Sequence, residues 1–252
     1  MQNMSEKNKS FVVIIPAYNE AEALPGLLLE LKQVIPSAPI VVISDGSKDQ
    51  TAEIARENGA IVIDLPCNLG VGGAVQAGLQ YACKYGYERV VRIDGDGQHN
   101  PADIPALLSH MDENNVDLVV GSRFLSEKVT GVGTQWRKLG NIALAKFLSV
   151  ICRHKVTDPT SGFWCVSSGL AKYFAHYYPT DYPEPEALSL LCRQGYSFSE
   201  VGVVVRQRQY GVSSITSIGT IYFALKVFVA LVADRLRPVD ANYARKNTVK
   251  EK

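Results

Sequence analysis

The chain has 252 residues, of which 46% are hydrophobic and 20% charged, as is usual for a globular protein with a substantial core. Its 26 basic and 25 acidic side chains nearly cancel, which argues against a general nucleic-acid binder. Five scattered cysteines without a C-x-x-C pair predict neither a metal site nor a disulfide framework, so we expect a reducing cytoplasm. The polar N-terminus lacks the apolar core of a signal peptide, and no long uncharged run predicts a membrane span.

Strands and helices alternate in the first half of the chain. Short apolar runs rich in Val and Ile predict strands at 11–15, 40–44, 60–65, 89–93 and 117–122. Apolar residues at helical spacing predict helices at 21–34, 51–58, 73–85 and 101–114. Asn100 and Pro101 suit the cap and the first position of the last of these helices. The order predicts an α/β fold with a mostly parallel open sheet covered by helices on both faces.

The second half follows a different rhythm. Helical patterns at 139–152, 168–176 and 186–194 alternate with loops rich in Pro, Thr and Ser, and one further strand is predicted at 199–205. We expect this half to extend the same domain over the carboxyl edge of the sheet. Ligands of open α/β sheets bind at that edge.

Four polar loops follow the first four predicted strands, at 16–20, 45–49, 66–73 and 94–99. Each alone could be a plain turn, but the carboxyl ends of parallel strands meet at one edge of a sheet, so we expect the loops to converge. The glycines of the third loop resemble a dinucleotide fingerprint. However, Val75 stands where that fingerprint requires a small residue, and the loop follows the third strand instead of the first. Glycines such as Gly70 are therefore expected to let the backbone approach a ligand.

The fourth loop places two carboxylates, Asp94 and Asp96, one residue apart directly after a buried strand. Close carboxylates repel each other, and a cation relieves that repulsion. Mg²⁺ and Mn²⁺ prefer oxygen ligands and are commonly held by one or two carboxylates together with phosphates and water. The motif therefore predicts a site for Mg²⁺ or Mn²⁺. For the neighbouring positions, hard-ion chemistry favours Gln98 over His99 as a further ligand.

The segments VIIPAYNE, ISDGSKDQT, NLGVGGA and RIDGDGQH occur in this order, and GSRF, DPTSGFW and RQRQYGVSSI follow them. In order and spacing they resemble glycosyltransferase family 2 with the GT-A fold, and in particular its polyprenol-phosphate sugar synthases. The resemblance covers about residues 11–235. The D-x-D-x-Q-H segment combined with R-x-x-G-x-S-S downstream is more specific than either segment alone.

The resemblance implies roles for matching positions on the donor side. Pro16, Tyr18 and Glu20 would line the nucleotide pocket, and Asp45 would contact the nucleobase. Asp94, Asp96 and Gln98 would hold the metal that bridges the donor diphosphate.

Three arginines complete the implied site. Arg208 would reach the diphosphate or the charge that leaves with it, whereas Arg123 and Arg137 would receive a lipid phosphate. Arginine suits phosphate because its planar fork donates paired hydrogen bonds.

The chain departs from the family at two positions. Ser44 precedes Asp45 where members often carry two aspartates, which bears on base or ribose recognition. Trp164 follows S-G-F where members often have a basic residue, which bears on the sugar or acceptor pocket. Glu184 and Glu186 stay open between a part in the acceptor or metal region and the ordinary preference for acid in the first turn of a helix.

The expected reaction moves a sugar, with inversion, from a nucleotide-diphosphate sugar to a polyprenyl phosphate such as undecaprenyl phosphate, for cell-envelope glycan synthesis. A UDP-sugar is the favoured donor and a GDP-sugar an alternative. One alternative function is transfer to a sugar hydroxyl of a growing polysaccharide, with Asp158, Glu184 or Glu186 as base. A second alternative is a non-catalytic subunit that binds nucleotide sugars.

The predicted boundaries are a disordered tail at 1–10, the catalytic domain at 11–214, an amphipathic helix at 215–237 and a basic flexible tail at 238–252. A core-packed helix is the alternative for the third segment. We expect that helix to meet the membrane surface or a small membrane protein, at the cytoplasmic face of the cell membrane. A homo-oligomer is also compatible with the sequence.

Overall fold

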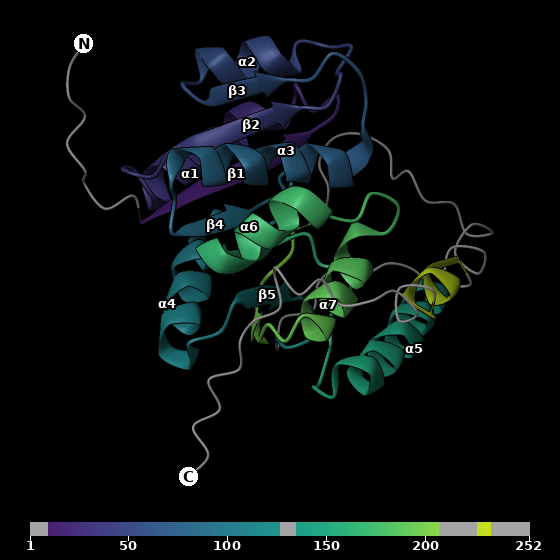
Figure 1. The fold of residues 1–252 in the computed structure, drawn as a ribbon. Helices are drawn as coiled ribbons and strands as arrows, with labels where there is room; N and C mark the ends of the chain where they lie inside the picture. Colours follow the sequence, from purple (N-terminus) through teal and green to yellow (C-terminus); the bar gives the residue numbers. More distant parts are fainter. Residues whose placement is uncertain (1–9, 127–134, 207–225, 233–252) are drawn as a thin grey trace.

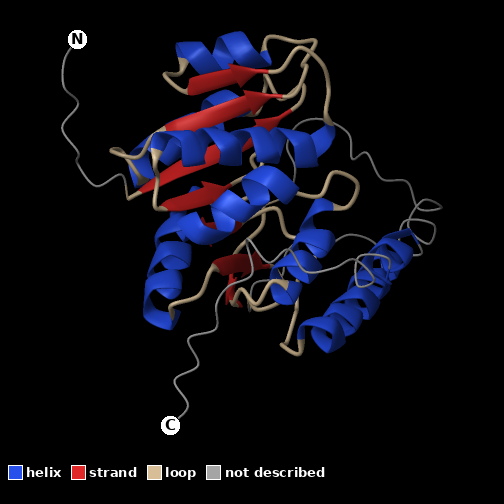
Figure 2. Cartoon of the chain, viewed as in Figure 1, coloured by secondary structure: helices blue, strands red, loops and turns tan. Residues whose placement is uncertain are grey.

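The computed structural model describes residues 10–126, 135–206 and 226–232. A seven-stranded sheet runs through the middle of the molecule (Figure 2). Its strands are β1 (Phe11–Ala17), β2 (Ile40–Ser44), β3 (Ile61–Asp64), β4 (Arg89–Arg92), β5 (Leu118–Ser122), β6 (Trp164–Ser167) and β7 (Phe198–Gly202). Their spatial order is β3-β2-β1-β4-β6-β5-β7.

The sheet is mostly parallel, as predicted, but β6 runs antiparallel to both of its neighbours, β4 and β5. Strand β6 was not among the predicted strands. It has only four residues and follows a loop of Asp, Pro, Thr, Ser and Gly, so its sequence alone does not stand out from that loop. Because β6 lies between them, β4 and β5 are not direct neighbours, although both end near the same edge.

Helices cover both faces of the sheet. They are α1 (Leu24–Val34), α2 (Thr51–Glu57), α3 (Gly70–Tyr85), α4 (Ile104–Asn114), α5 (Gln135–Cys152), α6 (Ser168–Tyr177) and α7 (Pro183–Arg193). Helices α3 and α6 lie side by side on one face, and α5 lies beyond α7 at the end of the molecule opposite α2 (Figure 1). The alternation along β1 explains the two cores: Val12 and Ile14 pack on one face, and Val13 and Ile15 on the other.

The predicted elements are present with shifted ends. The helix predicted at 73–85 begins at Gly70, so the glycines lie in its first turn and not in a loop before it. Asn100 caps the predicted turn by accepting a hydrogen bond from the amide of Ala102, but the first turn is a short 3-10 helix, Pro101–Asp103. Strand β3 is an edge strand with two exposed residues, so it is not buried on both faces.

Residues 226–232 form a helical segment beside α5. The rings of Phe147 and Phe228 lie 4.5 Å apart, and Val227 and Leu231 are buried in the core. The rest of the predicted helix at 215–237, residues 1–9 of the N-terminal tail and the tail at 238–252 lie outside the described residues. Within the part that the structure describes, no helix has the length and apolar character needed to cross a membrane.

Candidate active site

The loops after β1 and β2 are joined by hydrogen bonds, as predicted from their positions at the ends of neighbouring strands. The side-chain oxygen of Asn19 accepts from the amide of Lys48 at 2.8 Å, and the amide of Asn19 donates to Oγ of Ser47 at 3.2 Å. The amide of Glu20 donates to Oγ1 of Thr51 at 3.0 Å. Asn19 adopts a φ of 54°, which asparagine tolerates better than most residues.

Asp45 joins the second loop to the third. Its side chain is 3% exposed, and Oδ1 accepts a hydrogen bond of 2.7 Å from the amide of Leu69. Gly46 follows with a φ of +63°, and a Cβ there would lie 2.5 Å from the amide nitrogen of Asn68. Only glycine allows this close approach of the two loops. Asp45 therefore also supports the loop that leads to Gly70, the predicted ligand-binding glycine.

The other residues predicted to bind the nucleotide lie around the same edge. Tyr18 is 44% exposed, which leaves its ring open to a ligand. Pro16 is buried, and its carbonyl oxygen would lie 3.2 Å from a Cβ added to Gly95 in the fourth loop. Ser44 is buried, and its hydroxyl has no hydrogen-bond partner among the described residues. Ser44, which stands where family members often have aspartate, thus places a buried hydroxyl oxygen beneath this edge of the sheet.

Asp94 is held by an arginine two residues earlier in the chain. Nε and Nη2 of Arg92 donate to Oδ1 of Asp94 at 3.2 and 2.9 Å. Burial raises the pKa of Asp94, but the charge and hydrogen bonds of Arg92, together with the charges of His99 and Arg123, outweigh burial and hold the pKa below its usual value. Asp94 is therefore ionised and fixed in orientation at neutral pH.

Arg92 is 2% exposed and reaches a second carboxylate on another element. Its Nη1 donates to Oε1 of Glu184 in the first turn of α7 at 2.8 Å. Burial lowers the pKa of Arg92, but Asp94 and Glu184 more than offset this, so the pKa is raised above its usual value. One buried cation thus joins the predicted metal motif to Glu184.

Trp164 lies opposite Arg92 in the antiparallel pair of β4 and β6. The guanidinium lies 5.9 Å from the centre of the Trp164 ring, and Trp164 is 5% exposed. The tryptophan after S-G-F is therefore buried against Arg92, and with Asp158 and Glu184 it lines a small cavity. The sequence signal for Arg92 was a charged residue between Val91 and Ile93 in a predicted strand.

The residues that follow Asp94 form a compact turn. Oδ1 of Asp96 accepts from the amide of Gln98 at 3.0 Å, and Nε2 of Gln98 donates to the carbonyl of Arg206 at 3.3 Å. His99 is buried and stacks on Phe163, with ring centres 5.2 Å apart, and burial lowers its pKa. His99 therefore packs as a core residue, and its Nδ1 accepts from the amide of Asp94 at 3.4 Å.

The carboxylates of Asp94 and Asp96 suit a divalent cation that takes most of its ligands from a bound phosphate and from water. Among the described residues, no group of three or more His, Cys, Asp and Glu side chains is placed to hold a metal. Two carboxylates at a strand end suit Mg²⁺ or Mn²⁺, which complete their shell with phosphate oxygens and water. Asp94 and Asp96 would hold such an ion, with Gln98 beside them.

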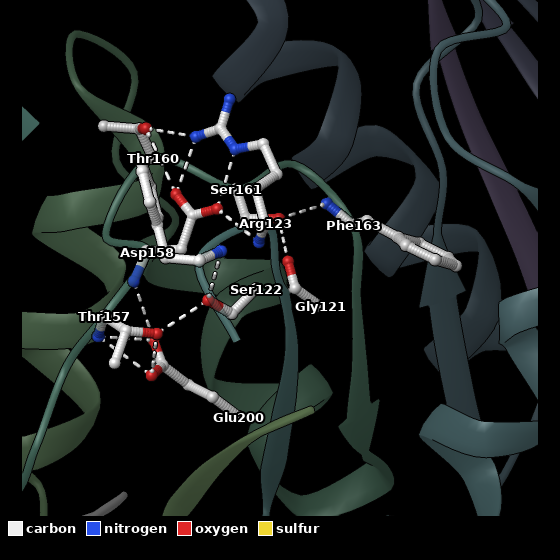
Figure 3. Close-up of polar contacts among 10 residues, drawn as sticks. Gly121, Ser122, Arg123, Thr157, Asp158, Thr160, Ser161, Phe163 and Glu200 are labelled. Atoms are coloured by element: carbon white, nitrogen blue, oxygen red, sulfur yellow. Dashed lines mark hydrogen bonds and ion pairs between the residues drawn. The ribbon is translucent and has the colours of Figure 1, made fainter. Parts of the chain in front are cut away.

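Arg123, which follows β5, is held by a buried carboxylate (Figure 3). Nε and Nη2 of Arg123 donate to Oδ2 and Oδ1 of Asp158 at 2.7 and 2.6 Å, and Asp158 is fully buried. Nη2 also donates to Oγ1 of Thr160 at 2.7 Å. Among the residues that the structure describes, none accepts a hydrogen bond from Nη1 of Arg123.

The loop at 157–163 touches both halves of the site. At one end Asp158 holds Arg123. At the other, a Cβ added to Gly162 would lie 2.3 Å from Oδ2 of Asp94, so only glycine lets the loop pass the metal motif this closely. Arg123 is near enough to contribute to the lowered pKa of Asp94. The structure therefore brings the predicted metal motif and the predicted phosphate-binding arginine together.

Of the remaining predicted residues, Glu186 is described in full, Arg137 by its backbone alone and Arg208 not at all. Arg137 lies in the first turn of α5, but its side chain is outside the description, and Arg208 lies outside the described residues. Glu186 lies in the first turn of α7, which starts at Pro183 instead of the predicted 186. Of the two acidic residues in that turn, Glu184 is the one that bonds Arg92.

The model of the family described as Glycosyl transferase family 2 matches residues 12–173 of this chain. The match covers more than half of the chain, which belongs to this family and is a glycosyltransferase. The sheet and its helices have the GT-A arrangement, as predicted.

Two curated relatives and one solved structure illustrate the likeness. The chain is 28% identical to a UDP-N-acetylglucosamine–dolichyl-phosphate N-acetylglucosaminyltransferase of Methanococcus voltae, over 89% of this chain and 96% of the relative. It is 32% identical to an undecaprenyl-phosphate mannosyltransferase of Micrococcus luteus, over 60% and 64%. Glucosyl-3-phosphoglycerate synthase of Mycobacterium tuberculosis, solved with Mn²⁺, UDP and phosphoglyceric acid, superposes with a TM-score of 0.68 at 20% identity, over 92% and 80%.

Proposed function

We propose that this glycosyltransferase moves a sugar from a nucleotide-diphosphate sugar, with UDP favoured as the nucleotide, to the phosphate of a polyprenyl lipid such as undecaprenyl phosphate. A divalent cation, Mg²⁺ or Mn²⁺, would assist it. The observation that carries the proposal is the loop at 157–163, which fixes a phosphate-type arginine, Arg123, beside the carboxylate of Asp94. The names of the two curated relatives, which both act on lipid phosphates, support the acceptor class.

On the donor side, the loops after β1, β2 and β3 would take the nucleotide, with Tyr18, Glu20 and Asp45 at its edge and Pro16 beneath. Asp94 and Asp96 would hold the cation against the diphosphate. The structural relative binds UDP and Mn²⁺ on the same fold, which supports this assignment. When bound, the cation neutralises charge that develops on the leaving diphosphate.

The acceptor chemistry needs positioning more than deprotonation. A phosphate monoester has its second pKa at about 6, so its oxygen is already anionic at neutral pH. That oxygen would attack the anomeric carbon in line as the bond to the nucleoside diphosphate breaks, which inverts the centre. Arg123 would hold the phosphate through Nη1, with Arg137, and Arg208 would stabilise the leaving charge. Glu184 bonds Arg92 and is therefore poorly placed to act as a base.

An apolar surface on α5 and residues 226–232 would bring the enzyme to its lipid substrate. We define the α5 surface by its exposed apolar side chains: Leu139, Ile142, Val150, Phe228, Val229 and Val232. Val150 is 78% exposed, the largest value in this set. Helix α5 carries Lys146 and no acidic residue, which suits an anionic bilayer. The protein would thus associate peripherally with the cytoplasmic face of the cell membrane.

The decisive experiment supplies the purified protein with Mn²⁺, radiolabelled UDP- and GDP-sugars in turn, and undecaprenyl phosphate in detergent. We expect a labelled lipid product with one of these donors. The Asp96→Asn variant should lower its rate about a hundredfold, because the cation site loses a carboxylate.

The matched control is Asp112→Asn, which changes an exposed carboxylate that pairs with Arg89 away from the site and should leave the rate unchanged. A labelled oligosaccharide formed without lipid product would replace the proposal with transfer to a sugar hydroxyl. Binding of nucleotide sugar without transfer to either acceptor would indicate a non-catalytic subunit.

A further inference from the structure

We propose that Glu200, on β7, is a positioning residue that sets the orientation of Arg123 toward the acceptor phosphate. The inference rests on the proposed function, since it assumes that Arg123 meets that phosphate. Glu200 does not touch Arg123. It acts through Thr157 and Asp158, which precede Pro159 in the loop beside Arg123 (Figure 3).

The carboxylate of Glu200 accepts hydrogen bonds from two consecutive residues, Thr157 and Asp158. Its Oε1 accepts from the amides of Thr157 and Asp158 at 2.9 and 3.0 Å. Its Oε2 accepts from the amide of Thr157 at 2.8 Å and from the Thr157 hydroxyl at 2.6 Å. A carboxylate that accepts from this many donors is tightly fixed, and it fixes their backbone in turn.

The backbone that Glu200 holds carries the carboxylate that holds Arg123. Asp158 receives Nε and Nη2 of Arg123 in a two-point fork and also the backbone amide of Arg123, at 3.0 Å. A shift of the Asp158 backbone would therefore move the guanidinium as a unit. Nη1 at the far side of the fork would move with it.

Glu200 also sets the direction of a chain of hydroxyls on the other side of Arg123. The Thr157 hydroxyl has one hydrogen, which it donates to Glu200, so the 2.6 Å contact to Oγ of Ser122 must be donated by Ser122. Oγ of Ser122 in turn accepts from the amide of Phe124 at 3.2 Å. Ser122 and Phe124 flank Arg123, so one carboxylate orders the backbone on both sides of it.

Glutamine at position 200 provides the sharpest substitution. It keeps the size of the side chain but has one oxygen in place of two, and its NH₂ group would face amide donors. We expect Glu200→Gln to raise KM for the polyprenyl phosphate about tenfold, with KM for the nucleotide sugar changed less than twofold. If Glu200→Gln does not fold, Thr157→Val removes the hydroxyl chain alone and should raise the acceptor KM in the same direction.

A double-mutant cycle with Arg123 tests whether Glu200 affects acceptor binding through Arg123 or by a general loss of stability. In an Arg123→Ala background, Glu200→Gln should change the acceptor KM less than twofold, because the group that it positions is gone. The matched control is Asp117→Asn. Asp117 holds the amide and hydroxyl of Ser197 at the opposite end of β5 and β7, so its loss should lower stability without moving the acceptor KM.

Two results would overturn the inference: an equal rise of both KM values in Glu200→Gln, or effects of Glu200→Gln and Arg123→Ala that multiply in the double variant. A spectroscopic measurement tells this failure apart from failure of the proposed function. The Nε–H proton of Arg123, which is hydrogen-bonded to the buried Asp158, should exchange slowly with water by ¹⁵N NMR. It should exchange faster in Glu200→Gln, even if the acceptor is not a lipid phosphate.

Discussion

At the scale of single residues, Arg92 links two parts of the candidate site by pairing with a carboxylate of each. It is a buried cation between Asp94 and Glu184, so its removal leaves two carboxylates facing each other without compensation. Loss of one partner from a buried ion pair costs about 3 kcal/mol. We expect Arg92→Met to lower the free energy of unfolding in urea by about that amount and to weaken Mn²⁺ binding, because Asp94 loses its fixed orientation.

Arg89 provides a control from the same strand. It pairs with Asp112, which is 64% exposed, and exposed pairs contribute about 0.2–1 kcal/mol. Arg89→Met should therefore cost less than about 1 kcal/mol and leave Mn²⁺ binding intact. Equal losses of stability in the two variants would show that Arg92 has no special part in the site.

Sequence reasoning reaches those candidate residues that belong to one continuous motif. Asp94 and Asp96 were singled out because two carboxylates after an apolar strand are visible within a few letters. Glu200 and Glu184 were not assigned their partners, since their roles depend on contacts 42 and 92 residues away along the chain. Such pairs become visible only when the strands and helices are placed.

At the scale of elements, α5 gives the clearest prediction. Replacing Ile142 and Val150 together by Gln should weaken binding to phosphatidylglycerol vesicles at least tenfold in a sedimentation assay. Each large apolar side chain that enters an apolar phase contributes about 1.5–3 kcal/mol. The pair is 48% and 78% exposed, so folding stability should hardly change.

Leu29 on α1 supplies the control for that experiment. It is 59% exposed but lies on a different helix, outside the α5 surface, so Leu29→Gln should leave vesicle binding unchanged. If all three substitutions reduced binding alike, general hydrophobicity and not α5 would account for it.

The elements themselves were largely predictable, with one instructive exception. Strands β1 and β2 are almost entirely apolar because both of their faces are covered, and such runs are hard to mistake. Strand β6 is equally central but has four residues and follows a loop of Asp, Pro, Thr, Ser and Gly. Its place between β4 and β5 comes from pairing with both, which no local pattern reports.

At the scale of the whole molecule, ligand binding should raise the thermal stability only when cation and nucleotide are present together. At a UDP concentration one hundred times its dissociation constant, with saturating Mn²⁺, binding adds about 2.7 kcal/mol. For a chain of this size, that corresponds to a rise in Tm of about 5–10 °C. Differential scanning calorimetry would measure it.

The Asp96→Asn variant isolates the cation's part in that rise. It should melt close to the wild-type Tm without ligands and gain much less from UDP with Mn²⁺. A full gain in this variant would mean that the cation is held elsewhere.

The position of the antiparallel strand β6 affects how the protein folds during its synthesis. The ribosome releases β4 and β5 before the strand that lies between them, so both strands emerge with open edges that can pair with other chains. The gap between β4 and β5 is filled only after residue 167 has been made, and the loop that joins Asp94 to Arg123 directly precedes that strand. A nascent chain that stops before β6 therefore lacks a complete sheet. It also lacks the contact between the two halves of the candidate site, so it should be inactive.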